Sequence, residues 1–173
     1  DVTKVEGVLK VNPVSDEVVV TITGDHAEGA YSGKPLTATG YSFASSNALY
    51  TSAKVAFSGE NSVSRIDAGT IDMDLQGKFT NADAVNFPNV RFDITNGSVA
   101  ISKAKVTLQS ANLTKEYDGT ALTNKNGGEG QTPLAVESGW AEGEGAAYTF
   151  TGSQTLVGGS PNAFSYTLNE NTK

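Results

Sequence analysis

The chain has 173 residues with 12 basic and 19 acidic side chains, so its formal net charge is −7. It has no cysteine and a single histidine, His26, which excludes disulfides, CxxC sites and metal sites built on paired histidines. Partners such as nucleic acids and anionic membranes require clustered Lys and Arg, so we expect neither of them. No apolar run approaches the length of a membrane span.

The first half of the chain carries strand patterns. Residues 18–23 form a β-branched run, and residues 54–58 alternate polar and apolar side chains, as a half-buried strand does. Helical spacing does not persist for three turns anywhere, and residues 45–55 allow at most one short helical turn. The composition is rich in glycine, with 19 residues, and favours turns between short strands.

Further strands are predicted along the rest of the chain. Ile71, Met73 and Leu75 alternate with polar residues, which places the apolar side chains on one face and the carboxylates in water. Residues 91–95 and 98–102 flank Asn96-Gly97, a pair that favours a type I′ hairpin turn. Residues 147–151 and 163–168 have the same character as these strands.

Two copies of one unit are visible in the sequence. Val20-Thr21-Ile22 returns 86 positions later as Val106-Thr107-Leu108, and Tyr31-Ser32-Gly33 returns with the same offset as Tyr117-Asp118-Gly119. A second block, Phe57-Ser58-Gly59, returns 93 positions later at Phe150. The second copy therefore carries about seven additional residues, placed in the Gly/Glu-rich insert at residues 126–145.

The first residues resemble the end of a copy. Asp1-Val2-Thr3 matches Asp93-Ile94-Thr95, and Gly7 with the apolar residues after it matches Gly97 and the strand that follows. We therefore expect residues 1–12 to be terminal strands of a preceding repeat, residues 13–103 to be a complete repeat, and residues 104–173 to be a second repeat that lacks its last strands.

Units of this size, with turn signals every 8–12 residues, favour small β-sandwiches. Residues 98–105 run into residues 106–109 without a glycine or proline linker, so we expect the two sandwiches to be arranged end to end. The alternative fold is a β-grasp repeat, which needs a helix of about ten residues or more packed across its sheet.

The motifs of the second copy carry a family resemblance. Tyr117-Asp118-Gly119-Thr120-Ala121-Leu122-Thr123, the Gly/Glu-rich stretch after Trp140, and Phe150-Thr151-Gly152 resemble the tandem Ig-like, MBG-type repeats of Gram-positive surface adhesins. The first copy departs from the pattern, because Ser32 replaces the turn aspartate. The resemblance implies tandem Ig-like repeats of an extracellular protein anchored to the bacterial cell wall.

That resemblance implies a non-catalytic stalk that presents an adhesive domain, with neighbouring repeats of the same protein as its partners. The competing hypothesis is that the repeats themselves bind host glycans such as mucin, or a host or extracellular-matrix protein. Trp140, the only tryptophan, and the insert at residues 126–145 would then be the contact surface, because an aromatic ring can stack on a sugar. A ring that covers a sheet edge is the alternative role for Trp140.

A calcium loop is the one metal motif to consider. Asp72, Asp74 and Gly77 occupy positions one, three and six of the pattern, with Asp83 at position twelve. Gln76 is a poor fifth ligand and no helices flank the loop, so the same residues also fit an ordinary strand. We therefore expect no metal and no cofactor, with these three aspartates as the only metal candidate.

An enzyme needs titratable groups that converge in a pocket, and one histidine with scattered carboxylates does not supply them, so we expect no enzyme activity. A second copy incomplete at its end would leave an open sheet edge, which recruits a further strand. The segment that contains Val5, Val8, Leu9 and Val11 is predicted to donate such a strand to a neighbouring molecule, head to tail.

Overall fold

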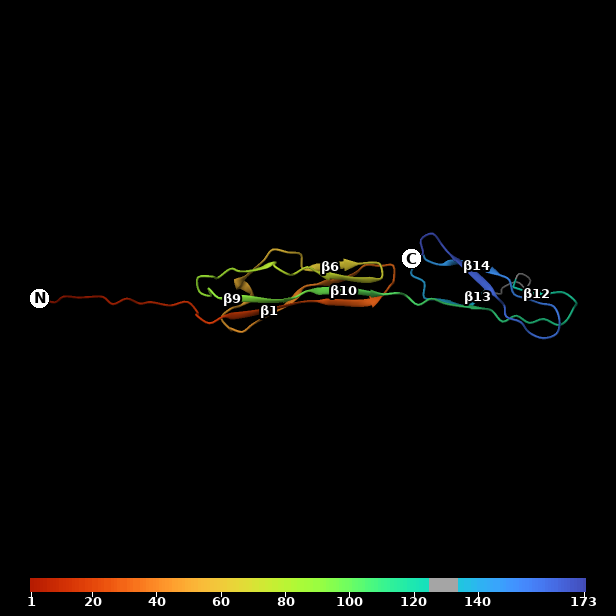
Figure 1. The fold of residues 1–173 in the computed structure, drawn as a ribbon, viewed down its shortest axis with the longest axis horizontal. Coiled ribbons are helices and arrows are strands. Elements are labelled where there is room, and N and C mark those ends of the chain that lie inside the picture. Colours follow the sequence, from red (N-terminus) through yellow and green to blue (C-terminus); the bar gives the residue numbers. More distant parts are fainter. Residues whose placement is uncertain (125–133) are drawn as a thin grey trace. The chain divides into compact units, whose positions relative to one another are not determined.

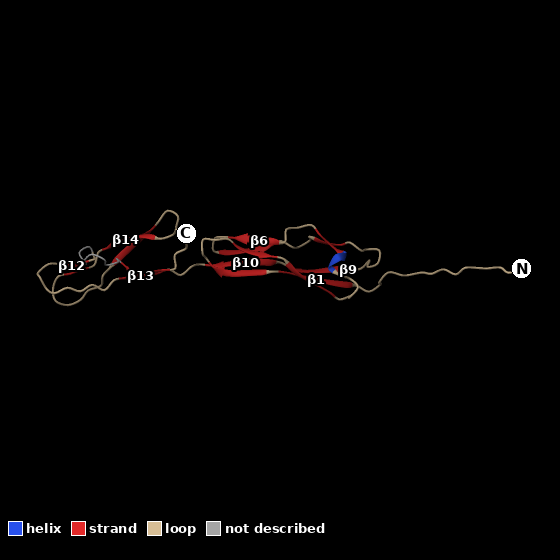
Figure 2. Ribbon diagram, turned by 180° about the vertical axis from the view of Figure 1, so that it is seen from behind, coloured by secondary structure: helices blue, strands red, loops and turns tan. Residues whose placement is uncertain are grey.

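The computed structural model describes residues 1–124 and 134–173, and it confirms the all-β prediction (Figures 1 and 2). The one helical element among these residues is the 3-10 turn η1 (Ser52–Lys54), inside the stretch where the sequence allowed a single turn. The described residues therefore contain neither the long helix that a β-grasp repeat needs nor a helix able to cross a membrane.

The chain divides into two compact units, which we call unit 1 (residues 1–29 and 35–101) and unit 2 (residues 30–34 and 102–173). The first ten strands are β1 (Val18–Gly24), β2 (His26–Ala30), β3 (Leu36–Thr39), β4 (Tyr41–Ser45), β5 (Val55–Phe57), β6 (Ser62–Arg65), β7 (Gly69–Met73), β8 (Phe79–Asn81), β9 (Val90–Thr95) and β10 (Gly97–Ser102). The other six are β11 (Thr107–Ser110), β12 (Leu122–Thr123), β13 (Leu134–Ser138), β14 (Ala146–Phe150), β15 (Ser153–Gln154) and β16 (Phe164–Leu168). The predicted strands at residues 18–23, 147–151 and 163–168 are confirmed as β1, β14 and β16.

Unit 1 contains two three-stranded sheets, with the strand orders β4-β1-β9 and β2-β10-β7, and two smaller pairs, β3·β6 and β5·β8. β1 pairs with β4 antiparallel and with β9 in parallel. The parallel register runs from Val18 opposite Val90 to Thr23 opposite Thr95. The strand near the start of unit 1 is therefore bonded directly to a strand near its end.

The predicted Asn96-Gly97 hairpin is wrong. β9 belongs to the sheet of β1, whereas β10 pairs with β7 antiparallel in the other sheet, so the chain changes sheet at this point instead of turning back. Neither residue has a positive φ, which a type I′ turn would require of both. A Cβ on Gly97 would overlap the carbonyl oxygen of Asp25, and a Cβ on Gly24 would overlap the backbone of Gly97. The glycine at this position is needed for close approach of two backbones, not for a turn.

The core of unit 1 follows the alternation of its strands. Val18, Val20 and Ile22 of β1 are almost completely buried. Aromatic rings of Tyr41, Phe57 and Phe79 continue this core, and Tyr41 meets Phe79 edge to face at 5.0 Å. The alternation predicted around β7 holds in part, since Met73 and Leu75 are buried whereas Ile71 is exposed. β7 ends at Met73, so Leu75 enters the core from the turn that follows the strand.

Among the described residues of unit 2, the strands form three antiparallel pairs, β11·β13, β12·β15 and β14·β16. Each has a counterpart at the equivalent place in unit 1, namely β1·β4, β3·β6 and β5·β8. The correspondence includes one aromatic pair. Phe57 lies opposite Phe79 with ring centroids 4.8 Å apart, and Phe150 lies opposite Phe164 at 5.5 Å. The internal repeat of the sequence therefore coincides with a repeated order of strand pairs.

Candidate binding groove

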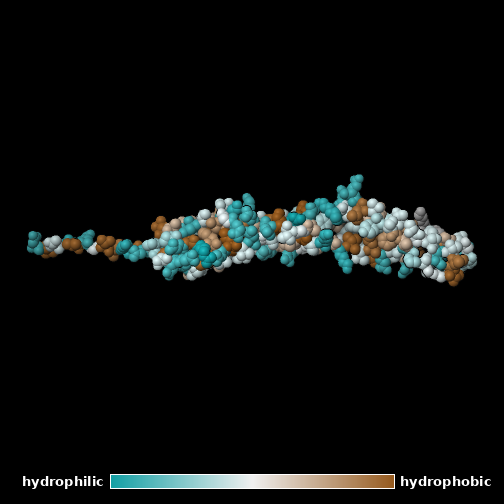
Figure 3. All heavy atoms as spheres, viewed as in Figure 1, coloured by the Kyte–Doolittle hydropathy of each residue, from teal (hydrophilic) through white to brown (hydrophobic). Residues whose placement is uncertain are grey.

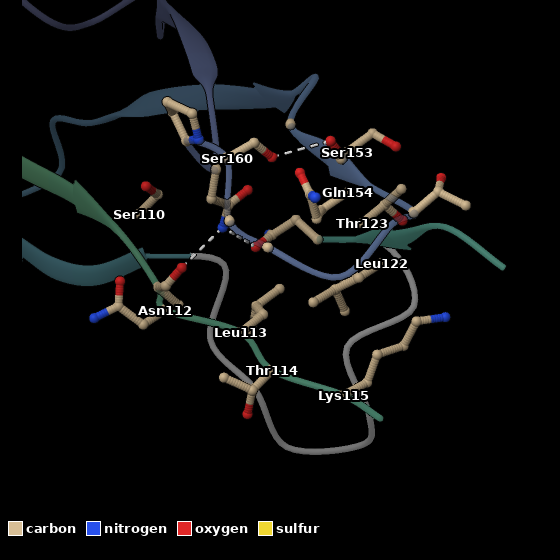
Figure 4. Close-up of a pocket in the computed structure, with 18 of the residues that line it drawn as sticks. Ser110, Asn112, Leu113, Thr114, Lys115, Leu122, Thr123, Ser153, Gln154 and Ser160 are labelled. Carbon is tan, nitrogen blue, oxygen red and sulfur yellow. Dashed lines mark hydrogen bonds between the residues drawn. The ribbon is translucent and has the colours of Figure 1, made fainter. Parts of the chain in front are cut away.

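A hollow with a volume of about 670 Å³ lies in unit 2 (Figure 4). One wall is the end of β11 with the chain that follows it, residues 109–117. The opposite wall is Gly152, β15 and the loop at residues 155–162, with residues 122–124 beside them. The walls are stretches of backbone from distant parts of the sequence, so the hollow is a groove between two chain segments.

Asn162 bonds to residues on both sides of this groove. Its side-chain Nδ2 donates to the carbonyl oxygen of Ala111 at 2.9 Å and to Oδ1 of Asn124 at 2.8 Å. Ser160 Oγ donates to the carbonyl oxygen of Ser153 at 3.1 Å within the opposite wall (Figure 4). These bonds tie the two walls together at one point and fix the loop that follows β15.

Apolar side chains line the groove and remain open to solvent at its rim. Leu113 and Leu122 point toward each other from neighbouring segments (Figure 4) and are each only half-buried. Leu156 and Val157 on the other wall are 71% and 89% exposed, and Tyr117 is 64% exposed. Exposed apolar side chains gathered along one groove are typical of an interaction or ligand-binding surface.

The turn beyond the groove is held by an aspartate. Asp118 Oδ1 accepts hydrogen bonds from Lys115 Nζ at 2.7 Å, from the Thr120 amide at 2.9 Å and from the Thr120 hydroxyl at 2.8 Å. These donors, Lys115 first, hold the pKa of the Asp118 carboxyl well below its usual range. Gly119 completes the turn with a φ of 78°, which side chains rarely tolerate. The equivalent Gly33 of the first copy has a φ of 73°.

Trp140 lies outside the groove lining. It is half-buried, and its indole Nε1 donates to Glu137 Oε1 at 3.1 Å. The Tyr148 hydroxyl donates to the same oxygen at 2.6 Å, and burial together with this carboxylate raises the pKa of Tyr148. Trp140, which the sequence analysis considered as a sugar contact, is thus linked to β13 and β14 through the Glu137 carboxylate. Residues 126–133 of the predicted contact insert lie outside the described residues.

Two of the three aspartates of the calcium motif pair with different lysines. Asp74 lies 3.4 Å from Lys78, and Asp83 pairs with Lys54, which is the main reason that the pKa of Asp83 is lowered. Asp72 lies on β7. Within residues 1–124 and 134–173, no three His, Cys, Asp or Glu side chains come together in a way that could hold a metal ion.

The setting of Asp83 was missed by the sequence reasoning. Tyr50 is 1% exposed, and its hydroxyl lies 3.0 Å from both the Lys54 carbonyl oxygen and Asn81 Oδ1. Burial raises the pKa of Tyr50, and the neighbouring Asp83 adds to this effect. The Lys54 ammonium lies 5.2 Å from the centre of the Phe87 ring. No local pattern in the sequence predicts this polar cluster.

His26 and the N-terminal segment complete the predicted candidates. His26 Nδ1 lies 2.9 Å from Ser98 Oγ on the exposed surface of unit 1. Residues 1–13 are described and carry no strand, and the side chains of Val5, Val8 and Leu9 are at least 87% exposed. Comparison of the chain with models of known protein families, with curated proteins and with solved structures found no match.

Proposed function

We propose that the chain is a non-catalytic, load-bearing part of a bacterial surface protein, built from tandem Ig-like β-sandwich units. In this proposal the parent protein is anchored to the cell wall and the units carry an adhesive domain away from the cell surface. The resemblance of the second copy to adhesin repeats supports the class of protein. The observation that carries the mechanical role is the parallel pairing of β1 with β9 in unit 1.

Parallel pairing of a first and a late strand decides how a pulled unit resists unfolding. Force applied along the chain pulls β1 toward its beginning and β9 toward its end, because β9 leads through β10 to the exit from unit 1 (Figure 1). Two parallel strands pulled in these opposite directions slide along each other, so the evenly spaced hydrogen bonds of the ladder are loaded together. An antiparallel hairpin pulled at its open end would instead lose its bonds one at a time.

The length of the pair makes this resistance substantial. The register joins Val18–Thr23 to Val90–Thr95, so the whole of β9 takes part. Val20 and Ile22 of β1 are completely buried under the same ladder, so sliding β1 would also expose core residues. Unfolding under force is governed by the unfolding rate, which such a barrier lowers.

Single-molecule stretching of the chain by its two ends tests the proposal with a matched pair of variants. Val20 in β1 and Val99 in β10 are both 0% exposed, so truncation to alanine should cost about 2 kcal/mol of unfolding free energy at either site. We expect Val20→Ala to lower the unfolding force of unit 1 clearly more than Val99→Ala, because only Val20 lies on the β1·β9 pair. Equal effects of the two variants on the force would contradict the proposal.

Binding of host glycans by the units is the competing function. A glycan array probed with the wild type and with Trp140→Ala separates the two, because a stacking tryptophan would be lost in the variant. We expect no signal that depends on Trp140, since its ring is half-buried and held to Glu137 of β13. Binding that disappears in the variant would favour the adhesive function instead.

A further inference from the structure

Asn96-Gly97 is one of two Asn-Gly pairs in the sequence, and the other is Asn126-Gly127. An asparagine followed by glycine can react with its own backbone, because the glycine amide nitrogen can attack the side-chain carbonyl carbon of the asparagine. Glycine favours this attack, since it has no Cβ to hinder the approach and turns freely about its backbone bonds. Asparagine is accordingly among the thermally labile residues of proteins. Asn96-Gly97 is therefore a reactive pair unless its surroundings prevent the attack.

The reaction has two steps, and water is its one co-reactant. The Gly97 nitrogen loses its proton and bonds to Cγ of Asn96, while the bond from Cγ to Nδ2 breaks and the amide nitrogen leaves with that proton as ammonia. The product is a cyclic succinimide, which water opens at either carbonyl. Opening at Cγ gives an ordinary aspartate. Opening at the main-chain carbonyl gives isoaspartate, in which the chain continues to Gly97 through Cβ and Cγ.

In unit 1 the strands on either side of this pair are held in different sheets. β9 is paired with β1 as far as Thr95. β10 pairs with β7 from Gly97 onward, and the Ser98 N–H donates to the carbonyl oxygen of Asp25 at 3.2 Å. The attack needs rotation about the backbone bonds of Asn96, which join these two strands. Such a rotation would pull β9 or β10 out of its sheet.

The two reacting groups are also restrained. Asn96 Oδ1 accepts a hydrogen bond from the Leu75 N–H at 3.0 Å, which fixes the orientation of the side-chain amide. Gly97 lies so close to the neighbouring backbone that a Cβ on it would be 2.3 Å from the carbonyl oxygen of Asp25. The backbone at Gly97 therefore has little space in which to swing toward the side chain of Asn96.

This protection comes from geometry and not from exclusion of water. Asn96 is only half-buried. Figure 3 shows hydrophilic and hydrophobic groups mixed over the face of unit 1 that it displays, so water surrounds the strands on this face. The reaction at Asn96 is therefore controlled by whether β9 and β10 stay in their sheets.

We propose that Asn96 is a modification site that reacts only when unit 1 unfolds, and that one of its two products prevents refolding. The aspartate product keeps the normal main chain, and its carboxylate accepts the Leu75 N–H as the amide oxygen does. The isoaspartate product lengthens the main chain between Thr95 and Gly97 by one carbon atom. β9 and β10 then cannot both keep their registers, and Gly97 has no room to shift against Asp25. Isoaspartate at this position locks unit 1 in the unfolded state.

The modification makes unfolding of unit 1 irreversible with time. A unit that opens briefly and refolds keeps its asparagine, whereas one that stays open for long is converted. Chemical modification of the unfolded state is a general route to irreversible unfolding. The inference does not rest on the proposed load-bearing role, because any cause of unfolding has the same effect.

Incubation of the full chain in mildly alkaline buffer, with and without concentrated guanidinium chloride, measures the protection. Peptide mass spectrometry follows the replacement of the amide by a carboxyl group at each asparagine. We expect Asn96 to react about a hundred-fold or more slower in the folded chain, because the reaction then requires an opening of the strands. In denaturant Asn96 should react as fast as Asn126, whereas Asn89, which precedes the β-branched Val90, should stay intact over the same period.

Refolding of the aged, denatured chain separates the two products. After dilution of the denaturant, resistance of residues 18–102 to limited proteolysis reports the folding of unit 1 alone. We expect isoaspartate at position 96 to be confined to the protease-sensitive fraction, and aspartate at this position to be recovered in the resistant fraction. Freshly prepared Asn96→Asp is the matched control, and it should refold as completely as the fresh wild type.

Three results would overturn this inference. Equal reaction rates at Asn96 in buffer and in denaturant would mean that the fold gives no protection. Isoaspartate present in the protease-resistant fraction, in the same proportion to aspartate as in the whole sample, would mean that unit 1 accommodates the longer main chain. Failure of freshly prepared Asn96→Asp to refold would contradict the separate fates of the two products.

Discussion

At the scale of single residues, the two positions that shape unit 1 most are glycines. Gly24 joins β1 to β2 and lies against Gly97, which begins β10. At these two glycines the chain passes from the sheet of β1 and β9 into the sheet of β2 and β10. Asn96 Oδ1 supports the crossing by accepting a hydrogen bond from the Leu75 N–H at 3.0 Å. Neighbouring backbones approach this closely only where neither residue has a Cβ.

Replacing Gly97 by alanine should therefore destabilise unit 1 by about 3 kcal/mol, because its Cβ would overlap the Asp25 carbonyl oxygen. Gly29→Ala is the matched control in the same unit, since its Cβ would be 3.4 Å from Leu36 and in ordinary contact. We expect the control to change stability by less than about 1 kcal/mol. Chemical denaturation followed by circular dichroism measures both, and equal effects would show that the glycine contact is unimportant.

The Asp118 turn should make unit 2 sensitive to acid. Its pKa is lower in the folded chain than the value of about 3.9 expected when unfolded, so the unfolded state takes up the proton first as the pH falls. The stabilisation is complete above the unfolded pKa and is lost as the pH falls through the folded pKa. Between about pH 5 and pH 2 the denaturation midpoint should fall more for the wild type than for Asp118→Asn.

Trp140 provides the signal for that measurement, because it is the only tryptophan and lies in unit 2. Midpoints of wild type and Asp118→Asn that fall in parallel across this pH range would mean that the turn does not respond to the charge of Asp118.

Calcium should leave the thermal stability of the chain unchanged. Asp83 is paired with Lys54 and Asp74 with Lys78, so a cation would have to displace an ammonium group from each. Calorimetry with calcium and with a chelator measures this directly. A melting temperature that rises by several degrees with calcium, and no longer does so in Asp74→Ala, would establish the metal site that the sequence motif suggested.

At the scale of elements, β1 and β11 are equivalent strands in different surroundings. β1 has β4 on one side and β9 on the other, whereas β11 has β13 as its one described neighbour. Amide hydrogen exchange in dilute solution should therefore be much slower in β1 than in β11. NMR of the amides of Ile22 and Leu108 makes the comparison at equivalent positions. Equal protection at low concentration would mean that β11 is already covered on both sides.

Local patterns predicted single elements better than their connections. The alternation of Val18, Val20 and Ile22 was enough to predict both β1 and its buried face, because burial of one face is a property of the strand itself. The Asn96-Gly97 prediction failed because the decisive contact is that of Gly97 with Gly24, 73 positions earlier. The Asn96-Gly97 pair, which is typical of turns, serves here in a contact between distant segments of the chain.

The groove was not predicted from the sequence, and strand donation by residues 5–11 stays a prediction. The sequence indicated an open edge in the second copy and an unattached strand at residues 5–11. It could not locate the groove, because its walls come from segments that meet only when β12 pairs with β15. Trp140 stood out by composition alone, and composition does not show its bond to Glu137, three positions earlier.

At the scale of the whole molecule, the proposal is that unit 1 resists force because its β1 and β9 are parallel. The force needed to unfold unit 1 then depends on the direction of pulling and not only on the free energy of unfolding. The absence of cysteine allows handles to be attached at chosen positions without side reactions. Asp16, Pro88 and Lys103 are exposed and lie just outside β1, β9 and β10.

The decisive measurement is therefore the unfolding force of unit 1 in two pulling geometries. Handles at Asp16→Cys and Lys103→Cys slide β1 along β9, whereas handles at Asp16→Cys and Pro88→Cys pull the paired starts of these strands apart and break the ladder bond by bond. The expected result is a clearly higher force in the first geometry, at equal thermal stability of the two variants. Equal forces, or a higher force in the second geometry, would contradict a load-bearing role for the β1·β9 pair.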